Sequence, residues 1–412
     1  MVTVKVAKTR KEIRDFVVFP TKLYKNDPYY VPDMVGDQIN DLMPDKNPAF
    51  EYCEARCFLA YRDGKIVGRV AGILNKRANE KNNVNYLRFA FFDFIDDAEV
   101  TDALYAALAD YARELGCVAI HGPQGFSDMD REGMLVEGFD RLSQFFVYYN
   151  YPYYLDHMAR LGFVKEVDWI EYLIHVPNEV PPRMEKIVAY TKKHMSLSIK
   201  DLSDKKNLPK YLKDVFALYN EAYQVIFGMV PLTPKQIEKY THEFLPLVNN
   251  KTSCFVYNDK DELLGFGVAA PSLSKANQKT RGRLFPFGWI TTLRALKGKN
   301  ERLDMLLIAV RPDMKGAGLN LVILEDLLRK GIRNGVKYAE TGPQLEMNKD
   351  VLSQWRLFET DQHKRRRCSP RSRRHRRRAV GPRRLLPGRP RRTARVHQIG
   401  RASCRERVLI PV

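Results

Sequence analysis

A repeated order of elements constrains the fold of this chain more than any other feature. Each copy is predicted to run hairpin, strand, helix, strand, and each closes on the same tripeptide, Gly122-Pro123-Gln124 in the first copy and Gly342-Pro343-Gln344 in the second. In the first copy these elements are predicted at residues 58–70, 88–95, 99–115 and 118–121. In the second copy they are predicted at residues 255–268, 303–310, 321–332 and 336–341. The repetition predicts a tandem duplication of one α/β unit.

Local residue patterns support these elements. Asp63-Gly64 between two β-rich runs is typical of a tight hairpin. Residues 303–310 form a short apolar run suited to a buried strand, and the residues that follow have apolar side chains at helical spacing, Leu321, Leu324, Leu328 and Ile332. A helix is also predicted at 11–23, an extended proline-rich arm at 27–48, and a strand at 168–176.

The predicted fold class is α/β (α+β), with two tandem domains built on a mixed sheet flanked by helices. A chain of 412 residues is long enough for two cores. The domains are predicted at 1–178 and 185–367, on either side of the linker Asn178-Glu179-Val180-Pro181-Pro182. Residues 368–412 are predicted to form an Arg-rich tail.

The net charge of +20 is concentrated in that tail. Residues 364–412 hold 19 Lys and Arg and one acid, which leaves 50 basic and 48 acidic residues in the rest of the chain. A nearly neutral body is not expected to bind nucleic acid. The Arg, Pro and Gly content from about Ser369 is typical of a gene read out of frame or of vector read-through, and the alternative is a genuine basic arm for RNA, DNA or anionic lipid. A frame lost here would remove the final strand of the second copy, and the tail alone is expected to be disordered.

The cysteines and the N-terminus predict a cytosolic, reduced protein. The six cysteines are scattered, and the Cys53 and Cys57 pair has no second pair to complete a zinc site. No group of His, Asp or Glu has the spacing of a metal site, so no metal is predicted. No apolar run approaches the length of a membrane span, and the charged N-terminus does not resemble a signal peptide.

A glycine turn precedes the helix of the second copy, reading Lys315-Gly316-Ala317-Gly318-Leu319-Asn320. A helix start presents unpaired backbone N–H groups and the positive end of the helix dipole, and glycines let a bulky anion approach. Arg311 and Lys315 add positive charge. The turn predicts a pyrophosphate site, although a glycine pair before a helix is also compatible with an ordinary turn.

The corresponding turn of the first copy has no glycine and carries four acids, Asp93, Asp96, Asp97 and Glu99. Acids cap a helix N-terminus well but repel a pyrophosphate, by roughly 1 kcal/mol per close pair in water. The first copy is therefore predicted to be a degenerate scaffold that shapes the acceptor site.

The glycine turn resembles the acyl-CoA loop of the GNAT N-acyltransferase superfamily, in which Arg/Gln-x-x-Gly-x-Gly/Ala follows a strand; Asn320 departs from that pattern. Several other segments resemble a bacterial tandem GNAT family over about residues 1–367, namely Asp27 to Pro32, the Asp63-Gly64 hairpin, Glu137-Gly138-Phe139-Asp140, Tyr153-Tyr154-Leu155-Asp156, both Gly-Pro-Gln turns and Gln362 to Cys368. Leu161-Gly162-Phe163 resembles the end of the closing helix of a GNAT fold. One bacterial branch that the chain resembles N-acylates long-chain sphingoid amines to make ceramides.

The resemblance implies an acyl-CoA or acetyl-CoA co-substrate held between the strand at 303–310 and the strand at 336–341. By resemblance, backbone groups of Ile308, Ala309 and Val310 would pair with the pantetheine arm. The full set of expected cofactor-binding residues is Ile308, Ala309, Val310, Arg311, Lys315, Gly316, Ala317, Gly318, Leu319 and Asn320.

Acyl transfer to an amine needs a base, donors for the thioester oxygen and an acid for the leaving thiolate. Tyr338 and Glu340 alternate onto one face of the last strand, and Glu346 follows it. A glutamate whose pKa is raised by partial burial could be the base, so Glu340, Glu346 and Tyr338 are the predicted catalytic residues. The alternative is that they pair or cap locally.

The acid for the thiolate is left unassigned. Many GNAT enzymes place a tyrosine about seven residues after an asparagine in the closing helix, and counting from Asn348 reaches Trp355. His121 precedes the first Gly-Pro-Gln turn and is expected to be a core histidine.

Residues 274–300 form a connection longer than a compact unit needs. The segment has seven Lys and Arg, no acid, and apolar residues between them, including Phe285, Phe287 and Trp289. Aromatics flanked by cations suit an anionic lipid surface, which predicts peripheral contact with the inner face of the membrane. The alternative is an arm that packs its aromatics on the other domain.

The predicted function is transfer of an acyl group from acyl-CoA to a small-molecule or lipid amine, with a long-chain, sphingoid-like amine as one candidate. The alternative is a non-catalytic acyl-CoA or lipid-binding protein, which Asn320 and the missing tyrosine favour.

Overall fold

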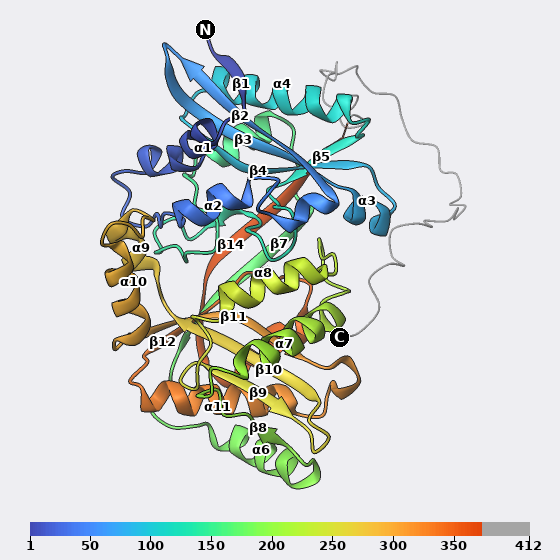
Figure 1. Ribbon diagram of the computed structural model, residues 1–412, viewed down its shortest axis with the longest axis vertical. Coiled ribbons are helices and arrows are strands. Elements are labelled where there is room, and N and C mark those ends of the chain that lie inside the picture. The colour runs from blue at the N-terminus through green and yellow to red at the C-terminus, as the bar shows by residue number, and fades with distance from the viewer. Residues whose placement is uncertain (373–412) are drawn as a thin grey trace, which may run out of the picture.

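The computed structural model describes residues 1–372 (Figure 1). The strands are β1 (Thr3–Ala7), β2 (Cys53–Arg62), β3 (Lys65–Asn75), β4 (Tyr86–Phe94), β5 (Ala119–Gly122), β6 (Met134–Glu137), β7 (Val167–His175), β8 (Ser198–Ile199), β9 (Ser253–Tyr257), β10 (Leu263–Pro271), β11 (Arg302–Val310), β12 (Tyr338–Thr341), β13 (Gln344–Leu345) and β14 (Glu359–Ser372).

The α-helices are α1 (Arg10–Leu23), α2 (Val35–Asp41), α3 (Lys76–Asn82), α4 (Ala98–Glu114), α5 (Tyr154–Arg160), α6 (Pro182–His194), α7 (Leu208–Ala222), α8 (Pro234–Phe244), α9 (Ser274–Thr280), α10 (Gly288–Lys297), α11 (Leu319–Arg333) and α12 (Lys349–Ser353). Short 3₁₀ turns lie at η1 (Pro48–Glu51), η2 (Pro312–Met314) and η3 (Gln354–Leu357). The predicted tail from residue 373 onward lies outside the described residues.

One mixed sheet runs through both halves of the protein, in the order β1-β2-β3-β4-β5-β14-β7-β12-β11-β10-β9-β8. Strand β6 pairs with β14, and β13 pairs with β7. Helix α4 packs on the first half of the sheet and α11 on the second, and both lie along their sheets in Figure 1. The predicted α/β class with a mixed sheet flanked by helices is therefore confirmed.

The two halves repeat one another in register as well as in order. The hairpin β2–β3 is followed by β4, α4 and β5, and the hairpin β9–β10 by β11, α11 and β12. Strand β4 runs parallel to β5, and β11 runs parallel to β12. The hairpin registers also match, because Gly68 of β3 pairs with Phe94 and Gly265 of β10 pairs with Val310. In both pairings a register shift, of the kind that a β-bulge introduces, lies a few residues before Phe94 in β4 and before Val310 in β11.

Strand β14 joins the two halves. It lies between β5 and β7, so a strand from the end of the described chain completes the sheet of the first half, while β7 from the first half pairs with β12 of the second. The boundary predicted between residues 367 and 368 falls inside this strand, which continues through Cys368 to Ser372. Sequence patterns are local, so they could not show that these residues pair with strands about two hundred positions away.

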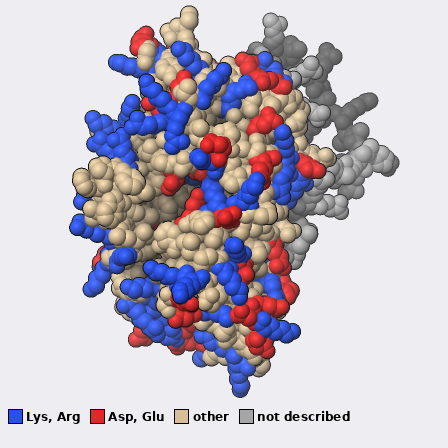
Figure 2. All heavy atoms as spheres, in the orientation of Figure 1, with Lys and Arg blue, Asp and Glu red and all other residues tan. Residues whose placement is uncertain are grey.

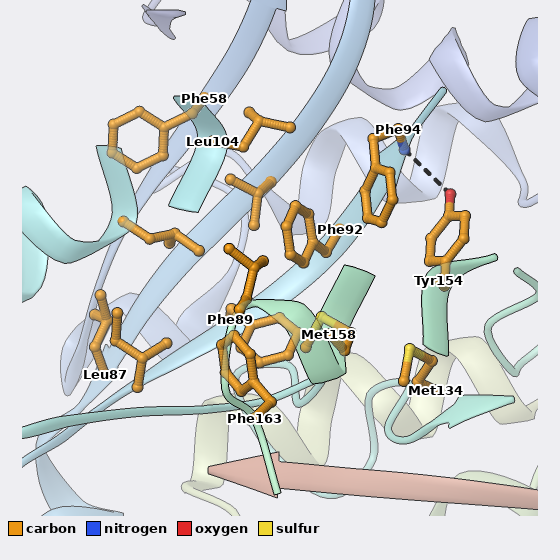
Figure 3. Close-up of a cluster of buried hydrophobic side chains, with 14 of the residues drawn as sticks. Phe58, Leu87, Phe89, Phe92, Phe94, Leu104, Met134, Tyr154, Met158 and Phe163 are labelled. Atoms are coloured by element: carbon orange, nitrogen blue, oxygen red, sulfur yellow. Dashed lines mark hydrogen bonds between the residues drawn. The ribbon is translucent and has the colours of Figure 1, made fainter. Parts of the chain in front are cut away.

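The core of the first half is rich in aromatic side chains. Phe89, Phe92 and Phe94 of β4 meet Leu104 of α4 and Tyr154 of α5 (Figure 3). In the second half, one core lies under α7 and α8, and another lies between α6, α11 and the sheet. These cores fix both faces of β10 and hold β11 beside the site described next.

Candidate active site

A cavity of about 1130 Å³ lies between the two halves. The second half lines it with β11, the glycine turn, the second Gly-Pro-Gln turn, α7, α8, α10 and α12. The first half lines it with α2, β7 and two loops. The cavity is larger than an ordinary small-molecule pocket of about 300–1,000 Å³. Apolar side chains such as Met129, Phe145, Phe146, Trp169 and Ile226 form much of the wall.

The cavity opens where β11 and β12 separate. The two strands pair only from Arg302–Tyr338 to Met305–Thr341, whereas β11 keeps its pairing with β10 as far as Val310. A register shift in the β10–β11 pairing falls at this point. Among the strands of residues 1–372, none pairs with the β12-facing edge of residues 306–310. The hydroxyl of Tyr223 reaches this edge and donates a hydrogen bond to the Ile308 carbonyl over 2.9 Å.

The glycine turn forms the next part of the wall. Gly316 and Gly318 have φ values of 76° and 83°, in the left-handed region that favours glycine. Within the described chain, the backbone N–H groups of Lys315, Gly316 and Gly318 donate to no protein group. The 15-residue helix α11 starts directly after Gly318, so its positive dipole end points at the same turn. A Cβ atom on Gly316 would meet no atom within 4 Å, which leaves room for a ligand.

The expected cofactor residues divide into two groups. Six of them line the cavity, namely Ile308, Ala309, Val310, Lys315, Gly316 and Asn320. Leu319 is buried in the core under α11, and Ala317 and Gly318 lie in the turn itself, next to Thr191. Arg311 faces away and pairs with Asp313 at 2.7 Å and with Glu262 at 3.5 Å.

The equivalent place in the first half is closed. The cavity there is only about 20 Å³ and is enclosed by side chains such as Phe92, Tyr149, Tyr154 and Met158. The acids of the first turn are engaged with the protein, because Asp97 caps α4 and pairs with Arg62 at 2.7 Å, while Asp96 pairs with His157 at 2.9 Å. The small cavity at this place leaves no space for a pyrophosphate, and the acids of the turn would repel it.

None of the three predicted catalytic residues lines the cavity. Glu346 pairs with Lys165 at 2.6 Å and with Arg365 at 3.1 Å. Tyr338 is partly exposed and packs edge-on against His175. Glu346 and Tyr338 thus make local contacts of the kind that the sequence analysis gave as the alternative to a catalytic role.

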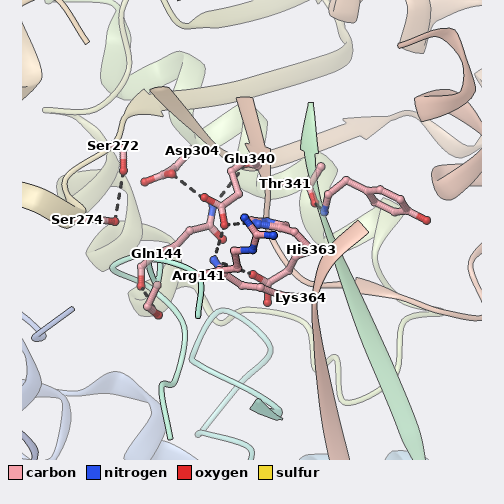
Figure 4. A network of polar contacts seen from close by, with 12 residues as sticks. Arg141, Gln144, Ser272, Ser274, Asp304, Glu340, Thr341, His363 and Lys364 are labelled. Atoms are coloured by element: carbon pink, nitrogen blue, oxygen red, sulfur yellow. Dashed lines mark hydrogen bonds and ion pairs between the residues drawn. The ribbon is translucent and has the colours of Figure 1, made fainter. Parts of the chain in front are cut away.

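Glu340 is buried within an ionic network between β12 and β14 (Figure 4). Burial alone would raise its pKa, but the Lys364 ammonium at 2.5 Å, His363 at 3.1 Å and Arg302 together lower it to about 2. The expected rise in the pKa of Glu340 is therefore wrong, since the compensating cations lie 24 and 38 positions away and spacing could not reveal them. A carboxylate with so low a pKa is a poor base near neutral pH.

Trp355 and His121 have structural positions. Trp355 is buried, and its indole N–H donates to Gln344 Oε1 over 2.7 Å. His121 lies against Tyr86 and 3.8 Å from Glu166, and burial lowers the pKa of its ring.

Two groups of side chains bring three ligand-type atoms within 4.8 Å of one another, His121 with Glu166 and Cys368, and Glu171 with Glu340 and His363. In the second group, Lys364 lies 3.6 Å from Glu171 and 2.5 Å from Glu340. The carboxylates are thus already compensated by a cation. Both groups bring together residues from separate segments of the chain, which is why sequence spacing did not show them.

A set of acids that sequence analysis missed also lines the cavity. The first half contributes Asp37, Asp41, Asp128, Asp130 and Glu132, and α8 contributes Glu243. Asp128, Asp130 and Glu132 follow the first Gly-Pro-Gln turn at every second position, and that alternation was the signal that could have identified them. Gln124 of the turn donates to Glu132 over 3.5 Å, and Tyr219 donates to Asp128.

Burial raises the pKa values of several of these acids into the physiological range. The pKa of Glu132 rises to about 8, first because of burial and then because of the neighbouring Asp128 charge. Burial raises the pKa of Asp130 to about 6 and that of Glu243 to about 7. Carboxyl groups with such values bind cations and exchange protons near neutral pH.

The architecture matches that of solved tandem proteins. A tandem GNAT protein from the clavulanic acid biosynthesis pathway superposes with a TM-score of 0.51 at 13% identity, covering 90% of this chain and 98% of that one. The chain has a tandem GNAT fold. The glucosamine N-acetyltransferase region of a fungal multi-domain β-N-acetylglucosaminidase also matches, with a TM-score of 0.53 at 12% identity, over 90% of this chain and 38% of that chain.

Two curated bacterial proteins are similar in sequence. Protein YghO of Escherichia coli is 24% identical over 345 residues, which is 82% of this chain and 87% of YghO. The bacterial ceramide synthase of Caulobacter vibrioides is 24% identical over 299 residues, which is 72% of this chain and 76% of that protein. No known family model matches the chain. Among the described residues, no helix is both long and apolar enough to cross a bilayer.

Proposed function

We propose that this protein transfers an acyl group from an acyl-CoA to an amine inside the cavity between its two halves. The proposal rests on two features that line the same cavity. One is the unpaired edge of β11 together with the backbone N–H donors of the glycine turn, and the other is a set of carboxyl groups with raised pKa values. The first part suits an anionic cofactor and the second suits a cationic amine.

In this proposal, the pyrophosphate of acyl-CoA binds the backbone N–H groups of the glycine turn at the start of α11, and Lys315 supplies a positive charge at the rim. The pantetheine arm lies along Ile308, Ala309 and Val310, on the edge of β11 that lacks a strand partner. The thioester then lies toward the point where β11 and β12 separate. Asn320 lines the same wall.

The acceptor amine binds among the acids of the first half. An ammonium group is attracted by Asp128, Asp130 and Glu132, and Glu132, whose pKa is about 8, accepts its proton. The neutral nitrogen attacks the thioester carbonyl. The new C–N bond forms as the C–S bond breaks, and the electron pair leaves with the thiolate. The nitrogen then loses its excess proton, which replaces the proton that Tyr223 gives to the thiolate.

Tyr223 is the proposed acid for the thiolate. Its hydroxyl contacts the Ile308 carbonyl, on the strand edge assigned to the pantetheine arm. Burial raises its pKa to about 12, so the phenol is protonated at neutral pH. Tyr223 therefore supplies the proton for the leaving thiolate, which Trp355 cannot donate. Glu340, Glu346 and Tyr338 are proposed to have structural roles.

A long-chain amine is the proposed acceptor class. The apolar walls and the volume of the cavity suit an alkyl chain. The similarity to the bacterial ceramide synthase of Caulobacter vibrioides supports a sphingoid-like amine within this class.

The test is release of free CoA thiol when the full chain is mixed with acyl-CoA and a panel of long-chain amines. Turnover that depends on both substrates supports the proposal. The alternative, a non-catalytic acyl-CoA or lipid-binding protein, is favoured by Asn320 and predicts tight CoA binding with no thiol release for any amine.

A further inference from the structure

Residues 274–300, called the basic insertion here, form a segment with α9 and α10 that projects at the left edge of the molecule (Figure 1). Its second helix, α10, has ten residues and none of them is buried. A helix that packs on a core buries one face. Helix α10 contacts α9 and β10, and its Thr292 and Leu296 line the cavity, but it buries none of its residues and is held at the surface.

The most exposed large apolar side chains of the basic insertion are aromatic. The exposed fractions of Phe285, Phe287 and Trp289 are 80%, 73% and 48%. Figure 2 shows this region as an uncharged lobe at the left edge of the molecule, bordered by Lys and Arg. The expectation that an arm of this kind would pack its aromatics on the other domain does not hold for these three residues. Contiguous exposed apolar groups of this size mark a binding surface.

The charges around the aromatics have one sign. The basic insertion carries seven exposed cations and no acid, with the cations at Lys275, Lys279, Arg281, Arg283, Arg294, Lys297 and Lys299. None of them forms an ion pair with any residue in the described part of the chain. Cations around an apolar tip complement the anionic headgroups and acyl boundary of a bilayer, where each contributes roughly fivefold to partitioning.

The base of the basic insertion is fixed to the rest of the protein. Gln278 donates to the carbonyls of Pro28 and Tyr30 over 2.8 Å and 2.9 Å, and the N–H of Val35 donates to the Gly282 carbonyl over 2.9 Å. The tip is thus presented in one orientation. It is also continuous with the cavity, since Leu284, Thr292 and Leu296 belong to the cavity wall.

We propose that the basic insertion docks on an anionic membrane surface and admits a membrane-resident long-chain amine directly into the cavity. This inference rests on the proposed function for the identity of the substrate. The docking itself rests on three observations: the aromatic side chains are exposed, all the charged side chains of the basic insertion are positive, and the insertion contributes residues to the cavity wall.

Trp289 is a built-in probe of docking. The chain has three tryptophans, and the other two, Trp169 and Trp355, are 1% and 2% exposed. On titration with phosphatidylglycerol vesicles, the Trp289 emission should shift to shorter wavelength as the ring leaves water. Phosphatidylcholine vesicles should bind about tenfold or more weakly, and 0.5 M NaCl should weaken binding to the anionic vesicles.

The double variant Phe285→Ala/Phe287→Ala should lose about tenfold or more in co-sedimentation with phosphatidylglycerol vesicles. Tyr190→Ala is the matched control, because Tyr190 is 66% exposed but lies on α6 in another part of the fold. Trp289→Phe should abolish the spectral shift while co-sedimentation persists. The proposal would be overturned if the protein bound neutral and anionic vesicles equally, if the emission did not shift, or if the double variant bound as well as the wild type. Binding of a protein partner in place of vesicles would also overturn it.

Turnover separates this inference from the proposed function. The double variant should release CoA thiol at the wild-type rate when the amine is dispersed in detergent micelles, and at about a tenth of that rate or less when the amine is in vesicles. Vesicle binding without any turnover would reject the proposed function alone. Turnover that is equally fast from vesicles in the double variant would reject docking alone.

Discussion

The hydroxyl of Tyr154 accepts a hydrogen bond from the backbone N–H of Phe94 over 3.1 Å at the end of β4 (Figure 3). Tyr153 binds the carbonyl of the same residue at 2.5 Å. Phe94 pairs with Gly68 as Val310 pairs with Gly265, so Phe94 and Val310 occupy equivalent positions in the two halves. Val310 lines the large cavity. In the first half, Tyr153 and Tyr154 therefore occupy the position that is open to the cavity in the second half.

The first prediction is that one CoA binds per chain. The first-half cavity of about 20 Å³ has no room for a cofactor, so calorimetric titration with CoA should give a stoichiometry of one. Tyr154→Phe should lower the free energy of unfolding by about 1 kcal/mol through the lost hydrogen bond and leave CoA affinity unchanged. A stoichiometry of two, or CoA binding weakened by Tyr154→Phe, would contradict the assignment of the site to the second half.

The second prediction concerns Lys315 at the rim of the glycine turn. Lys315→Glu places a negative charge beside the proposed pyrophosphate and should weaken CoA binding by about ten- to a hundredfold in calorimetry. Lys205→Glu is the control, because Lys205 is an exposed lysine of the same half outside the cavity. Equal effects of the two variants would show that the loss reflects net charge and not this site.

The third prediction is a pH dependence set by Glu132. Its carboxyl has a raised pKa of about 8, so the fraction that can accept a proton increases as the pH rises through 8. The wild-type kcat/KM for an amine should therefore rise between pH 6 and 9. Glu132→Gln should lower kcat by about a hundredfold or more and remove this inflection.

Glu179→Gln is the control for that experiment, because Glu179 is exposed and lies in the linker before α6. It should retain the wild-type pH profile. If Glu132→Gln also keeps an inflection near pH 8, Glu132 is not the base.

The fourth prediction is acid sensitivity caused by Glu340. Its pKa is lowered from 4.5 to about 2 in the folded protein, so its contribution to stability is complete above about pH 4.5 and is lost as the pH falls through 2. The full contribution is about 3 kcal/mol. Urea unfolding at pH 6 and pH 3 should show a smaller pH-dependent loss in Glu340→Gln than in the wild type. The exposed Glu359 of β14 provides the control Glu359→Gln, which should behave as the wild type; the same loss in all three proteins would contradict the role of the network.

The duplicated elements were predictable from sequence because their signals are local. Asp63 and Gly64 have φ values of 50° and 74°, as a tight hairpin with two left-handed positions requires. Helices α4 and α11 begin and end within a few residues of the predicted ranges. The position of β14 was not predictable, because its place between β5 and β7 depends on pairing between residues far apart in the sequence.

Only the part of the site that is formed by a local sequence motif could be predicted. The glycine turn is such a motif, and the structure places Lys315, Gly316 and Asn320 on the cavity wall. The protonation of Glu340 depends on Lys364 and Arg302, which only the folded sheet brings close. The acids around Glu132 come from a loop of the other half, so no pattern in the second copy could reveal them.

The most direct test of the central claim is mass-spectrometric detection of the amide formed from an isotopically labelled acyl-CoA and a long-chain primary amine. The full chain should produce the labelled amide in a one-to-one ratio with free CoA. Free CoA accompanied by labelled fatty acid and no amide, or intact acyl-CoA after incubation with the whole amine panel, would contradict acyl transfer to an amine in this cavity.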